Sequence, residues 1–391
     1  MIFSRTKISL GFLCLAMSAG VWGASPLKNA RLGENASLDP KPDAAEMMDD
    51  VTVSSGTKKG VDFIFAPIPF SNPTTGAGLA GMASLIYPLS PADAATPPSM
   101  TGLGGFYSEN DSWGAFLFQR LYLPGGRWRF NGGLAMMNFN YNYYGIGTEA
   151  GFDGQSIPVH QRINGLTADA LYRTWKSLFA GMTGVWSVSD VSMGGGLPPA
   201  GAGPGNGFKS QIGAVGPRLQ WDTRDNTFSA ATGSFFDGSF KYYGPALGSD
   251  YEYNITQLEY NHYWSPSEKH VWAARGYGRF ATGDVPFYAL SQFGMKSDLR
   301  GYVTGQFRDN MMIAVQAESR WRLTRRFGAA AFVGVGEVAP TLNSFNLENL
   351  LPSVGGGIRY ILSEQNRIVY RIDYAVGKGE QALYFNVGEA F

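Results

Sequence analysis

The chain has 391 residues and a formal net charge of zero, with no basic cluster, so nucleic acid is excluded as an expected partner. Charged residues make up only 16% of the chain, whereas aromatic residues reach 14% and glycines number 52. Beyond the first 23 residues there is no run of about 18 apolar residues, which excludes a membrane helix. A closed barrel is the remaining way to span a bilayer, and aromatic- and glycine-rich alternating segments are typical of it.

The first segment has the pattern of a secretory signal peptide. Two basic residues precede an apolar run at residues 8–19, and small residues allow cleavage after Gly23. We therefore expect a signal peptide at residues 1–23 and export from the cytoplasm. Because the only cysteine, Cys14, lies within that run, the mature chain is predicted to have no disulfide and no thiolate metal site.

The rest of the chain divides into two predicted parts. Residues 24–60 form a short N-terminal segment, expected in the periplasm, which is below the roughly 40 residues that an isolated domain needs. Residues 61–391 contain strand-like segments throughout and are predicted to form an outer-membrane β-barrel.

Polar and apolar residues alternate along the strand-like segments. Residues 367–376 place two arginines and an aspartate on one face and Ile, Tyr and Val on the other, and residues 312–323 repeat the pattern. A soluble sandwich has the same period, so alternation does not distinguish the two folds. Sixteen segments of this kind follow one another, at about 61–69, 76–88, 100–109, 112–123, 126–141, 159–175, 177–190, 208–224, 231–243, 251–265, 267–282, 310–323, 326–338, 352–363, 366–377 and 380–391.

The lengths of the connections do distinguish the folds. Connections after even-numbered segments are mostly short, apart from the proline-rich residues 89–99. The long ones follow odd-numbered segments, at about 142–158, 191–207, 283–309 and 339–351. Short periplasmic turns and long outer loops are typical of outer-membrane barrels. The sequence therefore predicts an all-β fold, a 16-stranded antiparallel transmembrane β-barrel.

The longest connection, residues 283–309, is unusually apolar. A solvated loop of this length would be polar. This one contains Phe287, Tyr288, Leu290, Phe293, Tyr302 and Phe307. We therefore expect the loop to pack against other parts of the protein.

Three stretches, in order and each on its expected strand or loop, resemble a known family. They are Leu219–Asn226 followed by Gly233, the loop sequence Leu299-Arg300-Gly301-Tyr302, and the ending Leu383–Phe391. Over about residues 61–391 the chain resembles the BamA/TamA superfamily of outer-membrane assembly and secretion barrels, also called the bacterial surface antigen family. The resemblance implies sixteen strands and a long sixth outer loop that is folded into the lumen with a Val-Arg-Gly-Phe/Tyr motif, here Leu299, Arg300, Gly301 and Tyr302.

Two departures from the family's pattern stand out. The family usually carries periplasmic repeat domains before the barrel, for which residues 24–60 are too few, so the resemblance implies a barrel-only member. The family also commonly has an aspartate on strand 13, in Phe-x-Asp-x-Gly, that holds the loop arginine. Here the corresponding stretch, Phe332–Gly336, has Gly334 in its place.

An arginine folded into a lumen needs other acceptors, because a desolvated, unpaired guanidinium is costly. By alternation, Asp373 and Glu318 face inward, and Glu337 lies just past the family's position. We expect Asp373, and after it Glu318, to be the loop-anchoring acids. The alternative is that Asp373 pairs with Arg371 or Arg359 as ordinary lumen wall.

Arginines dominate the predicted inward register, against few acids. An anion-preferring interior is one interpretation, and charges that only solvate the barrel and support the loop are the other. The predicted basic wall comprises Arg218, Arg224, Arg275, Arg279, Arg320, Arg322, Arg359, Arg367 and Arg371.

The first predicted strand carries two prolines, Pro67 and Pro69, which cannot donate to a strand ladder. In a closed barrel this strand must pair with the last one, so the seam between them should have few hydrogen bonds. In the family that the chain resembles, this seam is the lateral gate for client strands. Alternatively, the prolines direct their missing donors away from the ladder or end the strand early.

Phe391 ends an alternating, amphipathic segment. A C-terminal aromatic residue in this position is typical of the signal read by barrel assembly machinery, of which the chain would be a client. Glu389 falls on the same register as Phe385 and Phe391, where a charge is tolerable only near the membrane interface.

Catalysis has little support in the sequence. His160, His262 and His270 lie at strand ends, and none has the spacing of a metalloprotease or a serine hydrolase. We therefore expect no enzyme activity, no cofactor and no metal, a lipid-facing Ser–His site at His262 being the remaining alternative.

Two functional hypotheses remain. One is translocation or membrane insertion of a polypeptide or lipid substrate through a loop-plugged lumen and a weak seam. The other is a passive, anion-preferring pore or a structural barrel without translocase activity. Both place the chain in the bacterial cell outer membrane, among its lipid and lipopolysaccharide, and neither involves nucleic acid.

Overall fold

In the computed structural model, the structure describes residues 62–72, 74–90, 96, 99–194, 207–226, 229–294, 298–363, 367–379 and 381–391. The predicted signal peptide and the segment at 24–60 lie outside these residues, and their boundaries stay predictions.

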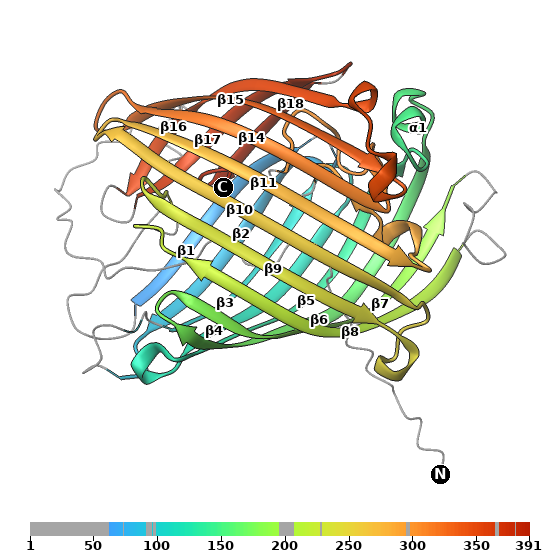
Figure 1. The fold of residues 1–391 in the computed structure, drawn as a ribbon, viewed down its shortest axis with the longest axis horizontal. Helices are drawn as coiled ribbons and strands as arrows, with labels where there is room; N and C mark the ends of the chain where they lie inside the picture. The colour runs from blue at the N-terminus through green and yellow to red at the C-terminus, as the bar shows by residue number, and fades with distance from the viewer. Residues whose placement is uncertain are drawn as a thin grey trace, which may run out of the picture.

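Sixteen antiparallel strands form a closed barrel (Figure 1). The predicted fold class is confirmed, and most predicted strand ends lie within about two residues of the observed ones. The strands are β1 (Asp62–Asn72), β2 (Gly76–Tyr87), β3 (Ser99–Ser108), β4 (Trp113–Tyr122), β5 (Trp128–Tyr143), β6 (Ile157–Trp175), β7 (Leu178–Met193), β8 (Gly207–Asp222), β9 (Gly233–Tyr243), β10 (Tyr253–Ser267), β11 (His270–Gly283), β14 (Met311–Arg322), β15 (Phe327–Ala339), β16 (Leu351–Ser363), β17 (Ile368–Gly377) and β18 (Gln381–Val387).

Among the described residues, helical structure is confined to the connections. It consists of α1 (Thr148–Phe152) and short 3-10 turns, and the two short strands β12 (Ser291–Gln292) and β13 (Arg308–Asp309) pair with each other inside the long loop. Among the residues that the structure describes, no helix is both long and apolar enough to cross a membrane.

In this barrel the polar side chains are buried inside and apolar side chains are exposed outside, the reverse of a soluble β-sandwich. On β14 the charged and polar side chains of Gln316 and Glu318 are 1% and 0% exposed, whereas Val315 is 60% exposed. Val333 on β15 and Val354 on β16 are similarly exposed. Since exposed apolar residues on one face suit lipid and buried charges on the other need partners, the barrel has an apolar outer wall and a polar inner one.

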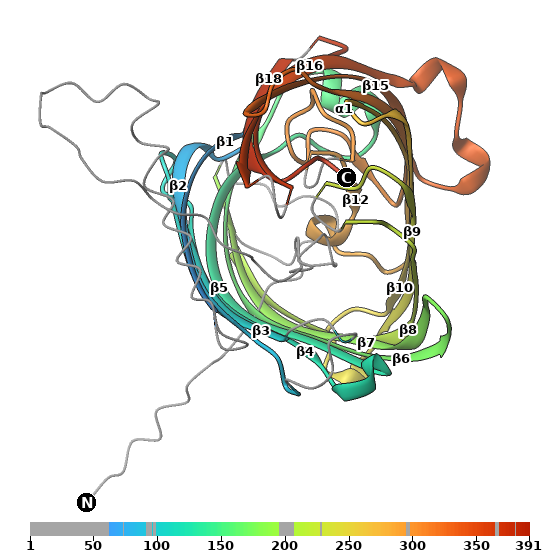
Figure 2. The ribbon, with the colours of Figure 1, turned by 90° about the vertical axis from the view of Figure 1, so that its left-hand side faces the viewer.

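The ring closes between its first and last strands. β1 pairs with β2 along its whole length, from Asp62 to Asn72, but with β18 at the single position Ser71–Phe385. Figure 2 shows the two strands side by side where the ring closes.

The last strand is shorter than predicted. β18 ends at Val387, Gly388 adopts a positive φ of 90°, and the chain then turns into the ring, where Figure 2 places the C-terminus. Phe391 is buried against Tyr263 and Ala273, and Glu389 bonds Arg359. The predicted outward register of Glu389 and Phe391 is therefore wrong. An outward carboxylate would lose its hydration in lipid, whereas inward it finds arginines.

Candidate functional site: the inner loop and the seam

The connection between β11 and β14 is buried at its centre. Phe293, Leu299, Tyr302 and Phe307 are 0% exposed and form one apolar cluster with strand residues that include Met312. Figure 2 draws β12, which belongs to this connection, within the ring of strands. We call residues 283–309 the inner loop.

Arg300 of the inner loop contacts both acids that alternation directs inward. Its Nη1 donates to Asp373 Oδ2 at 2.8 Å, and its Nη2 lies 2.5 Å from Glu318 Oε2. The second contact lacks the angle of a hydrogen bond, so the Asp373 contact is the better directed one. The guanidinium also lies 3.4 Å from the ring centroid of Phe332, which suits a cation–π contact.

The two acids are shared among several arginines. Glu318 Oε1 accepts from Arg320 at 2.6 Å, while Asp373 accepts from Arg359 at 2.5 Å and from Arg371 at 2.7 Å. The two alternatives for Asp373, pairing with Arg300 or with the wall arginines, thus occur together. Because the carboxylates are shared, each of these buried charges has an oppositely charged partner. An unpaired buried charge would destabilise the fold.

The glycine at the family's acid position makes room for the loop. A Cβ atom on Gly334 would lie 2.9 Å from Leu299 Cδ1 and 2.8 Å from Gln316 Cγ. Glu337, the further candidate, faces the opposite side of β15, where its carboxylate accepts from the backbone of Asn346. It does not contact Arg300.

Backbone hydrogen bonds hold the inner loop to both sides of the seam. The Gly301 amide donates to Tyr384 Oη of β18 at 2.9 Å, and the Thr304 amide donates to Thr74 Oγ1 in the β1–β2 turn at 3.0 Å. Gly301 has φ 108°, and a Cβ there would meet the backbone of Gly377 at 3.0 Å, so glycine is required by both conformation and space.

Tyr302 fixes the loop to the neighbouring strands. Its hydroxyl donates to the Pro352 carbonyl at 2.6 Å and accepts from the Lys378 amide at 3.0 Å. All four motif residues, Leu299 to Tyr302, are therefore in contact with the barrel wall.

The expectation of a basic wall with few acids is wrong. Arg218 bonds Asp169 and Asp237, both at 2.6 Å, and Arg275 bonds Glu259 at 2.7 Å. Sequence analysis missed these three acids, although they lie on the same inward register as the arginines. Arg218 and Arg275 are thus paired with carboxylates, as are Arg320, Arg359 and Arg371.

The remaining four predicted wall residues have other surroundings. Arg224 lies in the β8–β9 turn and pairs with Asp222, and Arg279 donates to Ser291 Oγ and to the Ala289 carbonyl of the inner loop. Arg322 is exposed at a strand end. Arg367 is half-exposed in the β16–β17 turn and bonds Asp225 of the β8–β9 turn.

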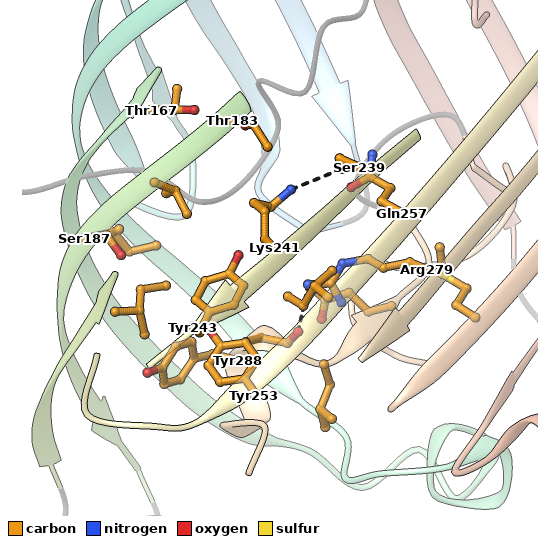
Figure 3. A pocket seen from close by; sticks show the side chains of 18 of the residues that line it. Thr167, Thr183, Ser187, Ser239, Lys241, Tyr243, Tyr253, Gln257, Arg279 and Tyr288 are labelled. Atoms are coloured by element: carbon orange, nitrogen blue, oxygen red, sulfur yellow. Dashed lines mark hydrogen bonds between the residues drawn. The ribbon is translucent and has the colours of Figure 1, made fainter. Parts of the chain in front are cut away.

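A cavity of about 150 Å³ remains between the inner loop and strands β6 to β11 (Figure 3). Tyr243 and Tyr253 stack there with ring centroids 4.1 Å apart, and Lys241 Nζ donates to Ser239 Oγ at 3.4 Å. Thr167, Thr183 and Ser187 supply hydroxyl groups to the lining. The inner loop therefore leaves a cavity beside strands β6 to β11, although its Phe287, Tyr288 and Leu290 pack against β5, β6 and β7.

The prolines of β1 lie at the seam, within the strand. Pro67 pairs with Gly81 and Pro69 with Leu79 of β2, so neither ends the strand early. The Pro69 carbonyl accepts from the Tyr370 hydroxyl at 3.4 Å. From Asp62 to Phe70, β1 has no partner on β18 among the described residues, because β18 ends at Val387, which the register of Ser71–Phe385 places opposite Pro69. The two prolines also lack donors.

Two of the three histidines contact a serine on the lipid-facing side. His262 Nδ1 lies 2.8 Å from Ser234 Oγ, and His270 Nε2 lies 2.7 Å from Ser319 Oγ. His160 instead contacts Asn140. Within the part of the chain that the structure describes, no carboxylate bonds either of the serine-paired rings, so neither pair forms a triad.

The comparisons with solved structures concern the fold. The chain is similar to BamA from Haemophilus ducreyi lacking POTRA domains 1–3, with 13% identity and a TM-score of 0.58 over 85% of this chain and 70% of that one. It is also similar to CdiB from Acinetobacter baumannii, with 14% identity and a TM-score of 0.53 over 84% of this chain, and to CdiB from Escherichia coli, with 11% identity and a TM-score of 0.56 over 86%. The chain spans 60% and 64% of these two CdiB chains.

The family rests on a separate finding. No curated protein sequence matches the chain. Residues 106–391, well over half of the chain, match the model of the Omp85 superfamily domain. The predicted family is confirmed, and the chain belongs to the Omp85 superfamily.

Proposed function

We propose that this barrel translocates or inserts polypeptide in the bacterial outer membrane, with the seam between β1 and β18 as the exit and the inner loop as a plug. The observation that carries the proposal is the single paired position, Ser71–Phe385, at the seam. Every other pair of neighbouring barrel strands is paired at many residue positions. The seam between β1 and β18 is therefore where the barrel opens most easily.

The free edge of β1 supports a strand-addition mechanism. An edge strand presents unpaired backbone groups to which an extended chain can bond. Pro67 and Pro69 reduce the number of donors on that edge, which makes its pairing weak and exchangeable. A client strand would therefore bind β1 reversibly, as release into the membrane requires.

The inner loop would couple the lumen to the exit. Gly301 bonds β18 and Thr304 bonds the β1–β2 turn, so the loop bridges the seam close to its paired position, Ser71–Phe385. Separating the two strands breaks at least one of these bonds. Movement of the loop and opening of the seam are then one event.

A photocrosslinking experiment tests the exit. A photoreactive residue replaces Phe65, which is 49% exposed on β1, or in the control Phe240, which is 40% exposed on the lipid-facing side of β9. In cells, polypeptide adducts are expected at position 65 and not at 240. Equal adducts at both positions, or none at either, contradict the proposal.

A disulfide lock supplies the second arm. Ser71→Cys with Phe385→Cys joins directly opposed residues across the seam, and Leu134→Cys with Leu166→Cys joins an opposed pair between β5 and β6 as the control. Oxidation of the seam pair should abolish the adducts at position 65, and oxidation of the control pair should not. A locked seam with undiminished adducts excludes the exit.

The other functions have weaker support. An anion-preferring pore requires unpaired basic charge, whereas Arg218, Arg275 and Arg359 each bond carboxylates and Arg279 bonds the inner loop. A structural barrel without translocase activity is the conclusion if both positions give no adducts while the barrel is folded. Localisation in the outer membrane, and dependence on barrel assembly machinery, are checked in the same cells by membrane fractionation.

A further inference from the structure

The connection between β15 and β16 lies against the outer wall of the barrel. Glu337 points outward, since its neighbours Gly336 and Val338 face the inner loop cluster and its partner on β14 is Ile313. Yet Glu337 is only 2% exposed, because its two carboxylate oxygens accept from the Asn346 amide at 2.9 and 3.1 Å. The connection, residues 340–350, therefore folds back along the outer face of β15 and covers the outward-facing Glu337.

The connection exposes both polar and apolar side chains. Among its polar groups, Asn346 Oδ1 accepts from the Glu348 amide, and Ser344 and Asn349 line a small cavity at the rim beside Val338. Two of its leucines are strongly exposed, Leu342 at 63% and Leu347 at 83%, whereas Phe345 and Leu350 are partly buried. Figure 2 shows short helical turns at this connection projecting sideways, outside the ring beside β15.

The height of the connection can be estimated from β15. Phe327, 52% exposed and edge-on to Tyr360, belongs to the aromatic residues at the short-turn end of the strands. Glu337 lies ten residues further along β15, which is about 33 Å along the strand and about 25 Å across the membrane at a typical tilt. The apolar band of such barrels is about 25 Å tall, so Glu337 lies at its outer boundary.

We propose that residues 340–350 are a membrane-binding element that inserts Leu342 and Leu347 between the acyl chains of the outer leaflet. Two further observations favour lipid as the occupant. The exposed apolar wall of Val333 and Val354 continues directly below the connection, and Glu348 is its only charged residue. The element would fix the depth of one side of the barrel, three strands away from the seam.

Fluorescence quenching tests the proposal. Because the only cysteine of the sequence lies in the predicted signal peptide, Leu347→Cys gives a single thiol for a polarity-sensitive nitrobenzoxadiazole probe. The control is Asp153→Cys, which labels an exposed residue beside α1 on the same side of the barrel. Each labelled barrel is placed, one per disc, in phosphatidylcholine nanodiscs with or without brominated acyl chains.

The expected result is a blue-shifted emission at position 347 and a loss of about half its intensity with brominated chains, against no change at position 153. Water-like emission at 347 with no quenching overturns the proposal. So does a blue shift that arises only in vesicles crowded with barrels, because the leucines would then contact a second copy. Glu337→Ala, which removes the acceptors of the Asn346 amide, should release the connection and reduce the quenching at 347 at least twofold; unchanged quenching there overturns the assigned role of Glu337.

Discussion

Leu299 of the inner loop lies in the space that a side chain at residue 334 of β15 would need. The distance from a Cβ on Gly334 to Leu299 Cδ1 would be only 2.9 Å. An aspartate therefore cannot stand at this position while Leu299 stays where it is. Arg300 instead contacts Glu318 of the adjacent strand β14 and Asp373 of β17, which lies two strands away on the other side. The glycine at residue 334 and the leucine at residue 299 are therefore linked, because the leucine side chain occupies the space that an acid at residue 334 would need.

Gly334→Asp should loosen the inner loop. The added side chain overpacks the space held by Leu299 and Gln316, and overpacking of this kind costs about 1 to 3 kcal/mol. We expect a lower free energy of unfolding in urea and faster proteolysis within residues 283–309. Adding Leu299→Ala to the same chain creates room and should restore part of the protease resistance. Identical proteolysis of Gly334→Asp and the parent would show that the contact does not hold the loop.

Arg300→Ala should destabilise the loop, but by less than the loss of an isolated buried pair. Removing one partner of such a pair costs about 3 to 5 kcal/mol, because the other charge stays unpaired. Here Glu318 keeps Arg320, and Asp373 keeps Arg359 and Arg371. We therefore expect Arg300→Ala to lower the free energy of unfolding by about 3 kcal/mol, which is the lower end of this range.

Two matched variants sharpen this measurement. Arg300→Lys keeps the charge but cannot reach two acids with a planar fork, so its loss should be intermediate. Arg322→Ala removes an exposed arginine of the same strand, β14, and should change the unfolding free energy by less than about 0.5 kcal/mol. If Arg300→Ala costs no more than Arg322→Ala, the buried contacts of Arg300 do not stabilise the loop.

Strand periodicity predicts the barrel well because it acts locally. The alternation along residues 312–323 placed Gln316, Glu318 and Arg320 inward without any knowledge of their neighbours. It could not tell that Arg300 contacts Glu318 and Asp373 together, since that depends on the register of strands far apart in sequence. Glu337 illustrates the same limit, because a shift of one residue moves a side chain to the other wall.

The C-terminal end of the last strand, β18, was harder to predict. Phe385 and Phe391 keep the alternating pattern across Gly388, so the pattern alone extends β18 to the end of the chain. The informative residue is Glu389, whose carboxylate has no place in an apolar wall but reaches Arg359 at 2.8 Å once the chain turns inward. The acids Asp169, Asp237 and Glu259 could have been found by applying to acids the register that selected the arginines.

Tyr384→Phe should weaken the link between the inner loop and β18. The Tyr384 hydroxyl accepts from the Gly301 amide at 2.9 Å, and its loss leaves a buried donor unpaired, which costs about 1 to 3 kcal/mol. The matched control is Tyr374→Phe on β17, where the hydroxyl donates to Gln381 on the exposed face. Tyr384→Phe is expected to lower the temperature at which the folded barrel loses its fast electrophoretic mobility, and the control is not. Equal shifts would attribute the effect to the hydroxyl group itself and not to the loop.

The contact between Asp225 and Arg367 should make the two short turns that it joins sensitive to acid. Burial alone would raise the pKa of Asp225, but the Thr232 amide, Arg367 and the Ala231 amide together hold it below its ordinary value. A carboxyl whose pKa is depressed on folding stabilises the protein above its unfolded pKa of about 3.9, and this stabilisation is lost as the pH falls through the folded value. The pair is partly exposed, so Asp225→Asn should cost only about 0.2 to 1 kcal/mol at pH 7. The urea midpoints of variant and parent should converge once the pH falls below the folded pKa of Asp225.

A second variant tests the partner of Asp225. Arg367→Gln should remove a similar amount of stability at pH 7, and combining the two changes should cost less than their sum, because both disrupt the same contact. A difference between Asp225→Asn and the parent that is as large in acid as at pH 7 would show that the ionised carboxylate is not what holds the turns together.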